Sequence, residues 1–261
     1  MKNIILTLLV LVAATNAPAA VISQWAFNST PPDSGVGTGT LTPSVGTGVA
    51  SVVGGVTSAF NGGSPSDPAA SGTDNSSLVA TNFPAQSTGS GTAGFQFTSS
   101  TVGFKDISVS FDLRAGVAAS RFYQLQITND GLTYVNVSAG TGQGATTLGT
   151  NSVATISNTG SIQINADSTS LTYGQGFSYT LAGGSAAENN ANFGFRVVSV
   201  FDPASGTQYV SSNAGTSVAY SAATGVRVDM VTISGSVIPE PTSLAFLAMG
   251  SIVALRRRRR E

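Results

Sequence analysis

The carboxylate side chains Asp106 and Asp112 are the residues whose type and spacing could support catalysis. They flank a segment of alternating apolar and polar residues, so both could lie on the outer face of one β-strand. A pair of carboxylates is the catalytic unit of glycoside hydrolases. Outward carboxylates on a half-exposed strand are more often solvated, however, and Asp112 with Arg114 is better explained as a surface pair. We therefore expect no catalysis from these residues.

Other catalytic side chains are scarce in this sequence. The chain contains no histidine and no cysteine, which excludes Ser-His-Asp and Cys-His catalysis, histidine-bound zinc and disulfide bonds. Glu188 lies in the loop-like sequence Ala-Ala-Glu-Asn-Asn, and nothing beside Lys105 suggests the nucleophile of a Ser-Lys dyad. The residues therefore predict a protein that is not an enzyme.

Ligand binding is the alternative that these residue types leave open. Carboxylates and loop carbonyls could hold a structural calcium ion, but no Asp-x-Asp-x-Asp-Gly spacing occurs, so we predict no cofactor and leave such a calcium without assigned ligands. Exposed aromatic rings could stack on a sugar, although packing in the core or at a sheet edge is favoured for all four candidates: Tyr134, Tyr173, Tyr179 and Tyr209.

Alternating apolar and polar residues predict β-strands, and no segment of the body has helical periodicity. Val21–Phe27 is expected to be the first strand, with Val21, Ser23, Trp25 and Phe27 on one face and Trp25 in the core. Many short strands at this spacing predict an antiparallel β-sandwich. Further strands are expected at Gly94–Thr98, Ile107–Leu113, Arg121–Thr128, Thr133–Val137, Ser161–Asn165, Gln175–Leu181, Phe193–Phe201 and Val226–Ser234.

Two stretches between these strands have distinctive compositions. Asn129-Asp130-Gly131 supplies the residues of a positive-φ hairpin turn into Thr133–Val137. Residues 31–94 are rich in Gly, Ser, Thr and Ala, which indicates long loops with weak edge strands such as the piece Ser77–Thr81, and disorder is an alternative for part of them.

The body of the chain, residues 21–236, is mildly acidic. It contains five basic and ten acidic side chains, a net charge near −5, whereas the whole chain is at −1 because of its C-terminal arginines. Charged residues make up 9% of the chain, well below the roughly 25% of an ordinary globular domain. Such a composition is common in secreted all-β surface proteins.

The last 25 residues, Val237–Glu261, combine three segments in a fixed order. Pro239-Glu240-Pro241 favours an extended backbone, because each proline lacks an N–H donor and restricts its predecessor. Residues 242–255 are uncharged and form a short apolar helix of roughly 21 Å, which spans a membrane only with help from flanking arginines. The residues expected to anchor this helix and stop its transfer are Leu244, Phe246, Leu247, Ile252, Val253, Leu255, Arg256, Arg257, Arg258, Arg259 and Arg260.

The arginine run favours the cytoplasmic side of a membrane. It follows an apolar helix in an otherwise acidic chain, so we expect no nucleic-acid binding. The whole tail resembles the PEP-CTERM sorting domain of Gram-negative bacteria. That resemblance implies recognition and processing by exosortase, a membrane transpeptidase-like enzyme. The phrases Phe111-Asp112-Leu113-Arg114, Gln124-Leu125-Gln126 and Val228–Gly235 also resemble passenger domains that precede such tails, which implies a jelly-roll sandwich related in shape to carbohydrate-binding modules.

The N-terminus has the features of an export signal. Lys2 precedes an apolar run from Ile4 to Ala14, and small residues follow. Cleavage after Ala19 fits best, with Ala17 and Ala19 at the small-residue positions, and cleavage after Ala20 is the alternative. The expected partners are therefore the export machinery and signal peptidase, followed by exosortase.

Together these patterns predict a signal peptide at 1–20, a jelly-roll-like β-sandwich at 21–236 and a sorting signal at 237–261. The fold class is all-β, flanked by a signal helix and a short transmembrane helix. We expect an exported structural or adhesive protein, anchored transiently in the inner membrane with its C-terminus in the cytoplasm and then released to the cell surface or extracellular matrix. The alternative is a carbohydrate-binding module for extracellular polysaccharide, followed by a carboxylate-based glycan-degrading enzyme.

Overall fold

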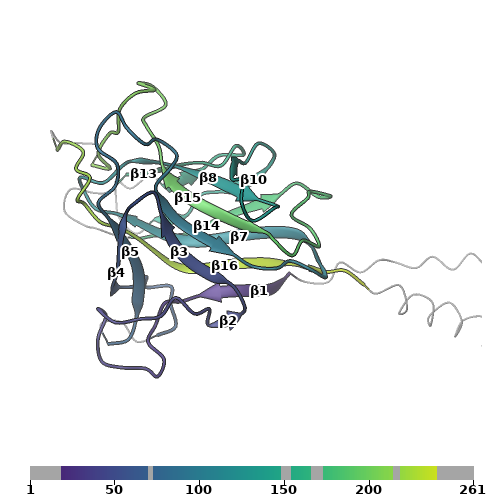
Figure 1. Ribbon diagram of the computed structural model, residues 1–261. Helices are drawn as coiled ribbons and strands as arrows, with labels where there is room; N and C mark the ends of the chain where they lie inside the picture. Colours follow the sequence, from purple (N-terminus) through teal and green to yellow (C-terminus); the bar gives the residue numbers. More distant parts are fainter. Residues whose placement is uncertain (1–18, 70–72, 148–153, 166–172, 214–217, 240–261) are drawn as a thin grey trace, which may run out of the picture.

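The computed structural model describes residues 19–69, 73–147, 154–165, 173–213 and 218–239. In these residues the regular structure consists of strands, which form two antiparallel sheets facing each other (Figure 1). The larger sheet contains β1 (Ala20–Trp25), β2 (Val45–Gly46), β4 (Thr57–Gly62), β5 (Ser76–Thr81), β7 (Phe104–Ala115), β10 (Gly140–Gln143), β11 (Thr146–Thr147), β14 (Gly174–Leu181) and β16 (Val226–Val237). The smaller sheet contains β3 (Val49–Val53), β6 (Gly94–Thr98), β8 (Phe122–Thr128), β9 (Val135–Asn136), β12 (Ala154–Ile156), β13 (Ser161–Ile164) and β15 (Gly194–Ser199).

The strand order agrees with the jelly-roll-like expectation. The larger sheet contains the run β5-β16-β7-β14, and the smaller one contains β6-β15-β8-β13. Successive strands β5, β6, β7 and β8 therefore alternate between the sheets, and so do β13, β14, β15 and β16. The predicted all-β sandwich is confirmed.

The core lies between the two sheets and is built from alternate residues. In β7, Ile107, Val109, Phe111 and Leu113 point inward and are at most 1% exposed. Phe111 lies 5.6 Å from the ring of Phe177 in its own sheet and 6.4 Å from that of Phe195 in the other. Phe97 links the same cluster to Trp25, with ring centroids 5.3 Å apart.

The first strand follows its prediction except at its start. Ser23, Trp25 and Phe27 are buried, and Trp25 lies in the core as expected. Val21 was expected on the same face, but its side chain is 46% exposed. The pairing of β1 with β16 shifts register between Val21 and Ser23, so the alternation of faces is broken at that point.

The loop-rich segment 31–94 contains one strand that is not a weak edge. β5 pairs with β4 on one side and with β16 on the other, and its residues from Ser76 to Ala80 are buried. The hydroxyl groups of Ser76 and Ser77 donate to the carbonyl groups of Thr38 (2.7 Å) and Asn61 (2.9 Å). The loop at Thr38 and the neighbouring strand β4 thus satisfy these polar side chains, which is why a serine-rich sequence can be buried here.

The predicted hairpin between β8 and β9 is present, with Gly131 at a φ of 76°. Its turn is fixed by the Asp130 carboxylate, which accepts hydrogen bonds from the backbone N–H groups of Leu132 (2.8 Å) and Thr133 (2.7 Å). These backbone hydrogen bonds lower the pKa of Asp130. Asp130 is therefore explained by its turn rather than by a metal ion.

Candidate functional site

The two carboxylates that the sequence singles out do not form a catalytic pair. Asp106 is exposed near the start of β7, where its carboxylate lies 3.9 Å from the Lys105 ammonium group. Asp112 lies on the same strand, six residues further on, which is a separation of about 20 Å at about 3.3 Å per residue. Catalytic carboxyl groups of glycosidases lie about 5–10 Å apart. Asp106 and Asp112 are therefore too distant to act on one glycosidic bond.

The expectation that Asp112 is a solvated surface residue was wrong. Its side chain is 3% exposed, although it points to the outer face of the larger sheet. One carboxylate oxygen accepts a hydrogen bond from the backbone N–H of Gly176 (2.6 Å), and the other accepts one from the hydroxyl of Ser66. A loop and a bulge in β14 therefore cover Asp112. Arg114 does not pair with it, because the ion pair Lys105–Asp106 is the one that the described residues contain.

A second aspartate, which sequence reasoning missed, lies directly opposite Asp112. Asp229 of β16 pairs with Asp112 of β7 in the register of the two strands, and it is fully buried. The register shifts immediately after this pair, where Met230 has a φ of 47°. The sequence carries a signal of this bulge: Val226 and Val228 are buried at even positions, and Val231 and Ile233 at odd ones. Asp229 follows the inward-facing Val228 and therefore points to the outer face, and the bulge after it returns Val231 to the core.

The environment of Asp229 favours its neutral form. Its oxygens accept hydrogen bonds from the backbone N–H groups of Ser64 (2.6 Å) and Met230 (2.7 Å). Burial nevertheless raises the pKa of Asp229 to about 8, and the charges of Asp67 and Asp112 contribute in the same direction.

The neighbouring Asn75 supports the same assignment. Its side-chain oxygen is buried and has no donor among the described residues. That oxygen and Asp229 Oδ2 crowd the same space: they would lie 1.8 and 2.6 Å from a β-carbon placed on Gly63. A protonated Asp229 carboxyl would supply the donor that Asn75 Oδ1 lacks. The loop after β4 closes over both groups, since Asn75 also donates to the Ser64 carbonyl (2.7 Å).

Beside this buried pair the outer face of the larger sheet is hollowed into a polar groove with a volume of about 470 Å³. The lining comes from four neighbouring strands and the loop after β4: Gln24, Ser66, Ser110, Phe111, Asp112, Gln175, Gly176, Met230 and Thr232. Gln24 donates to the Thr232 hydroxyl (3.1 Å), whereas the Gln175 side-chain nitrogen is buried and has no acceptor among the described residues. The hydroxyl and amide side chains that line this hollow are of the types that suit a polyhydroxylated ligand. We call this hollow the sheet groove.

The four tyrosines considered as sugar platforms do not line the groove. Tyr173, Tyr179 and Tyr209 are at most 4% exposed, so packing is their role, as favoured from the sequence. Tyr134 is half-buried, and its ring is covered by the Arg196 guanidinium at 3.6 Å from the centroid. Stacking of a sugar on a tyrosine is therefore not the binding mode that this surface offers.

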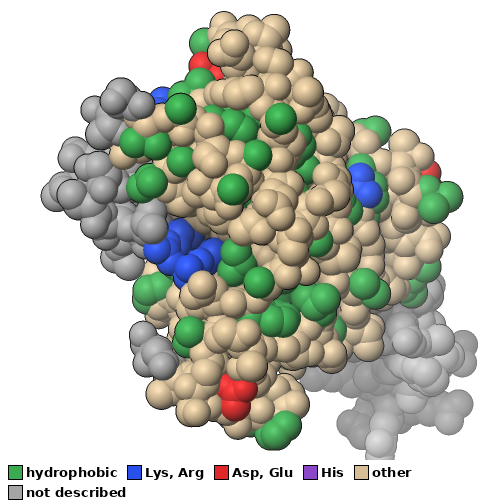
Figure 2. Space-filling model, turned by 60° about the vertical axis from the view of Figure 1, so that its left-hand side comes forward, with side chains coloured by type: hydrophobic (Ala, Val, Ile, Leu, Met, Phe, Trp, Pro, Cys, Tyr) green, Lys and Arg blue, Asp and Glu red, His purple; other side chains and the backbone are tan. Residues whose placement is uncertain are grey.

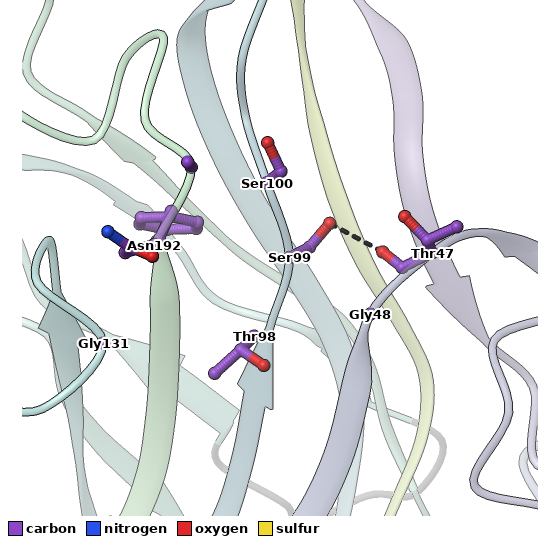
Figure 3. A pocket seen from close by; sticks show the side chains of 9 residues that line it. Thr47, Gly48, Thr98, Ser99, Ser100, Gly131 and Asn192 are labelled. Atoms are coloured by element: carbon purple, nitrogen blue, oxygen red, sulfur yellow. Dashed lines mark hydrogen bonds between the residues drawn. The ribbon is translucent and has the colours of Figure 1, made fainter.

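A second hollow of about 310 Å³ lies between loops at one end of the sandwich (Figure 3). Small residues line it, among them Thr47, Gly48, Thr98, Ser100 and Gly131. The Ser99 hydroxyl donates to the Thr47 carbonyl (2.8 Å), the bond drawn in Figure 3. Because no titratable side chain lines this hollow, the sheet groove is the better candidate for a functional site.

The described residues bear on two further predictions, one about metal binding and one about a membrane helix. There, no group of three or more acidic side chains is arranged to hold a metal ion, and no helix is long and apolar enough to cross a membrane. The predicted membrane helix 242–255, its arginine cluster and the predicted signal sequence up to Pro18 lie outside the described residues. Of the sorting tripeptide, Pro239 is described and is exposed.

β16 leads directly into the C-terminal segment that the sequence analysis singled out. A family model, the PEP-CTERM protein-sorting motif, matches residues 237–260. The chain carries a PEP-CTERM sorting motif. The match begins at the last residue of β16 and includes the Pro-Glu-Pro tripeptide, the apolar stretch and the arginine cluster. The motif implies an exported protein that is sorted at a membrane by exosortase. No curated protein and no solved structure matches the chain significantly.

Proposed function

We propose that this PEP-CTERM protein is a structural or adhesive component of the bacterial cell surface or extracellular matrix and has no catalytic activity. The observation that carries the proposal is the sorting motif directly after the last strand of the sandwich. The described carboxyl groups support a non-catalytic role, because Asp106 and Asp112 are far apart and Asp229 is closed off from solvent. The role requires no cofactor.

In the proposed route, the export machinery translocates the body and signal peptidase cleaves after Ala19. The helix at 242–255 then holds the protein in the inner membrane, with Arg256–Arg260 in the cytoplasm. Exosortase recognises Pro239, Glu240 and Pro241, removes the tail and passes the sandwich on to the surface. The short apolar span suits an anchor that is needed only until processing.

The route is tested by mass analysis of the mature protein. In a strain with exosortase the mature chain should lack Arg256–Arg260, and in a strain without it the chain should keep them. A variant with Pro239→Ala and Pro241→Ala should accumulate unprocessed in the first strain. An intact C-terminus in a strain with active exosortase would show that the tail is only an anchor.

The sheet groove favours carbohydrate binding as a second function. The hydroxyl and amide groups that line the groove match the donors and acceptors of a polysaccharide. In affinity electrophoresis against a panel of polysaccharides, Gln175→Ala should weaken binding about tenfold. The matched control is Gln163→Ala on the smaller sheet, which should bind as the original chain does. Hydrolysis of a polysaccharide that is lost in Asp112→Asn would instead revive the enzyme hypothesis.

A further inference from the structure

Two arginines lie side by side beyond one end of the sheet groove. Arg114 of β7 and Arg227 of β16 are partners in the strand register, and each is flanked by inward-facing residues, so both point to the outer face. Like charges that are directly opposite each other destabilise a sheet. In Figure 2 basic side chains gather most densely in one patch, and the acidic side chains visible on that face lie well away from it. The adjacent Arg114 and Arg227 side chains would therefore be stabilised by a negative charge close to both.

The described residues do not provide a direct counter-ion. Their one ion pair, Lys105–Asp106, lies at the other end of β7. One Arg227 nitrogen donates to the Gly62 carbonyl (3.0 Å), which also accepts from the Tyr173 hydroxyl (3.0 Å). These bonds hold the Arg227 side chain in place, but no carboxylate among the described residues forms an ion pair with it. Arg114 is half-buried, and burial together with the charge of Arg227 lowers its pKa.

The nearest carboxyl groups compensate only in part. The next pair in the same register is Asp112 and Asp229, two residues along each strand, or about 7 Å. Both oxygens of Asp112 already accept hydrogen bonds from Gly176 and Ser66. Asp229 is mostly neutral at pH 7, because burial raises its pKa to about 8. At neutral pH the four side chains therefore keep a net positive charge.

The geometry points to an oxyanion site formed by Arg114 and Arg227, which binds the carboxylate groups of an acidic polysaccharide lying in the sheet groove. This inference rests on the proposed carbohydrate binding. Guanidinium groups match the planar, two-oxygen geometry of a carboxylate. Asp112 lines the groove, and Arg114 follows it two residues later on the same face of the same strand, so a sugar chain that extends from the groove past the loop at Ser66 would place a uronate at the arginines.

The test compares two polymers with the same sugar backbone: polygalacturonate, which is charged, and its fully methyl-esterified form, in which every carboxylate is a neutral ester. The full chain should bind the acidic polymer at least tenfold more tightly, and added salt should reduce the difference. Arg114→Gln with Arg227→Gln should abolish the preference and leave binding to the esterified polymer unchanged. Lys105→Gln, which removes one positive charge from the same strand, is the matched control and should keep the preference. Thermal unfolding of each variant verifies that it is folded.

Three results would overturn the inference. The double variant could keep the preference, Lys105→Gln could lose it equally, or the arginine pair could bind vesicles containing phosphatidylglycerol in place of the acidic polymer. Equal binding of both polymers would refute the arginine site but leave the groove as a carbohydrate site. The chain could also bind neither polymer but still bind free galacturonate or inorganic phosphate through the arginines. That result would refute the carbohydrate function and the polysaccharide as the occupant, and would support a site for small oxyanions.

Discussion

The Asp229 carboxyl lies where an isolated charge would be costly. It is fully buried and lies opposite Asp112. The two backbone N–H groups that donate to it lower its pKa, but burial raises the pKa by more. A proton on this carboxyl would give the unpartnered oxygen of Asn75 beside it a donor. The same proton determines how much net positive charge surrounds Arg114 and Arg227. One buried acid thus links the stability of the fold to the charge of the candidate site.

Protonation of Asp229 predicts a pH-dependent stability. The folded carboxyl keeps its proton up to about pH 8, whereas the unfolded one loses it near its ordinary pKa of about 4. Between these values the unfolded state binds fewer protons, so the free energy of unfolding should fall as the pH rises, by up to about 1.4 kcal/mol per unit. This contribution is fully present below pH 4 and is lost by about pH 8. Denaturant unfolding at pH 5, 6, 7 and 8 measures it.

The variant Asp229→Asn, which cannot ionise, should flatten this dependence. Asp106→Asn, at an exposed carboxylate, is the control and should keep the original slope. The lowered pKa of Asp130 does not interfere, because its contribution is lost only as the pH falls below its ordinary range. A slope that persists unchanged in Asp229→Asn would assign the titration to another group.

At the scale of elements, the loop after β4 covers the Asp229 carboxyl and separates it from solvent. Gly63 donates its N–H to the Asn75 carbonyl (2.8 Å), and a β-carbon at this position would meet Asn75 Oδ1 and Asp229 Oδ2. The preceding Gly62 has room instead, since the nearest atom to its β-carbon would be an Arg227 nitrogen at 3.8 Å. A β-carbon can therefore be added at Gly62 without a clash, whereas one at Gly63 would displace neighbouring atoms.

Gly63→Ala should destabilise the protein by about 2–3 kcal/mol, because the loop must move away from the buried carboxyl. Water admitted to Asp229 should also bring its pKa toward the ordinary value and flatten the pH dependence. Gly62→Ala should change the free energy of unfolding by no more than about 0.5 kcal/mol. Denaturant unfolding of both variants at two pH values makes the comparison. Equal effects of the two substitutions would contradict the proposed closure of the loop.

The elements also show what a sequence pattern can and cannot predict. Strict alternation in Ile107–Leu113 predicted β7 and its inward face, because a strand's side chains alternate regardless of its neighbours. The burial of Asp112 could not be predicted from that segment, since the cover comes from Ser66 and Gly176, far away in the chain. Asp229 was missed for the same reason, because the loop with Ser64 that covers it is far away in the chain. Local periodicity predicts faces, whereas the site depends on contacts between distant segments.

At the scale of the whole molecule, the first and the last strand of the sandwich bring the two ends of the described body together. Ala20, which begins β1, pairs with Gly235 of β16, so the predicted signal cleavage point and the sorting motif adjoin one end of the sandwich. Backbone hydrogen bonding to the sandwich continues one residue past β16, because the Ile238 N–H donates to the Gly103 carbonyl (2.8 Å). Pro239 therefore follows the folded domain without a linker, and the domain limits how closely an enzyme can approach the tripeptide.

Lengthening this junction should speed processing. Six residues of a Gly-Ser linker inserted between Ile238 and Pro239 would move the sandwich roughly 13 Å away, by the random-coil estimate for such chains. We expect the shortened product to appear several-fold faster in a pulse-chase experiment in a strain with exosortase. The control is the same insertion between Gly183 and Gly184, where added β-carbons would meet nothing within 4 Å. A processing rate unchanged by the first insertion would show that the enzyme reaches the tripeptide before the sandwich folds, and that the close junction imposes no limit.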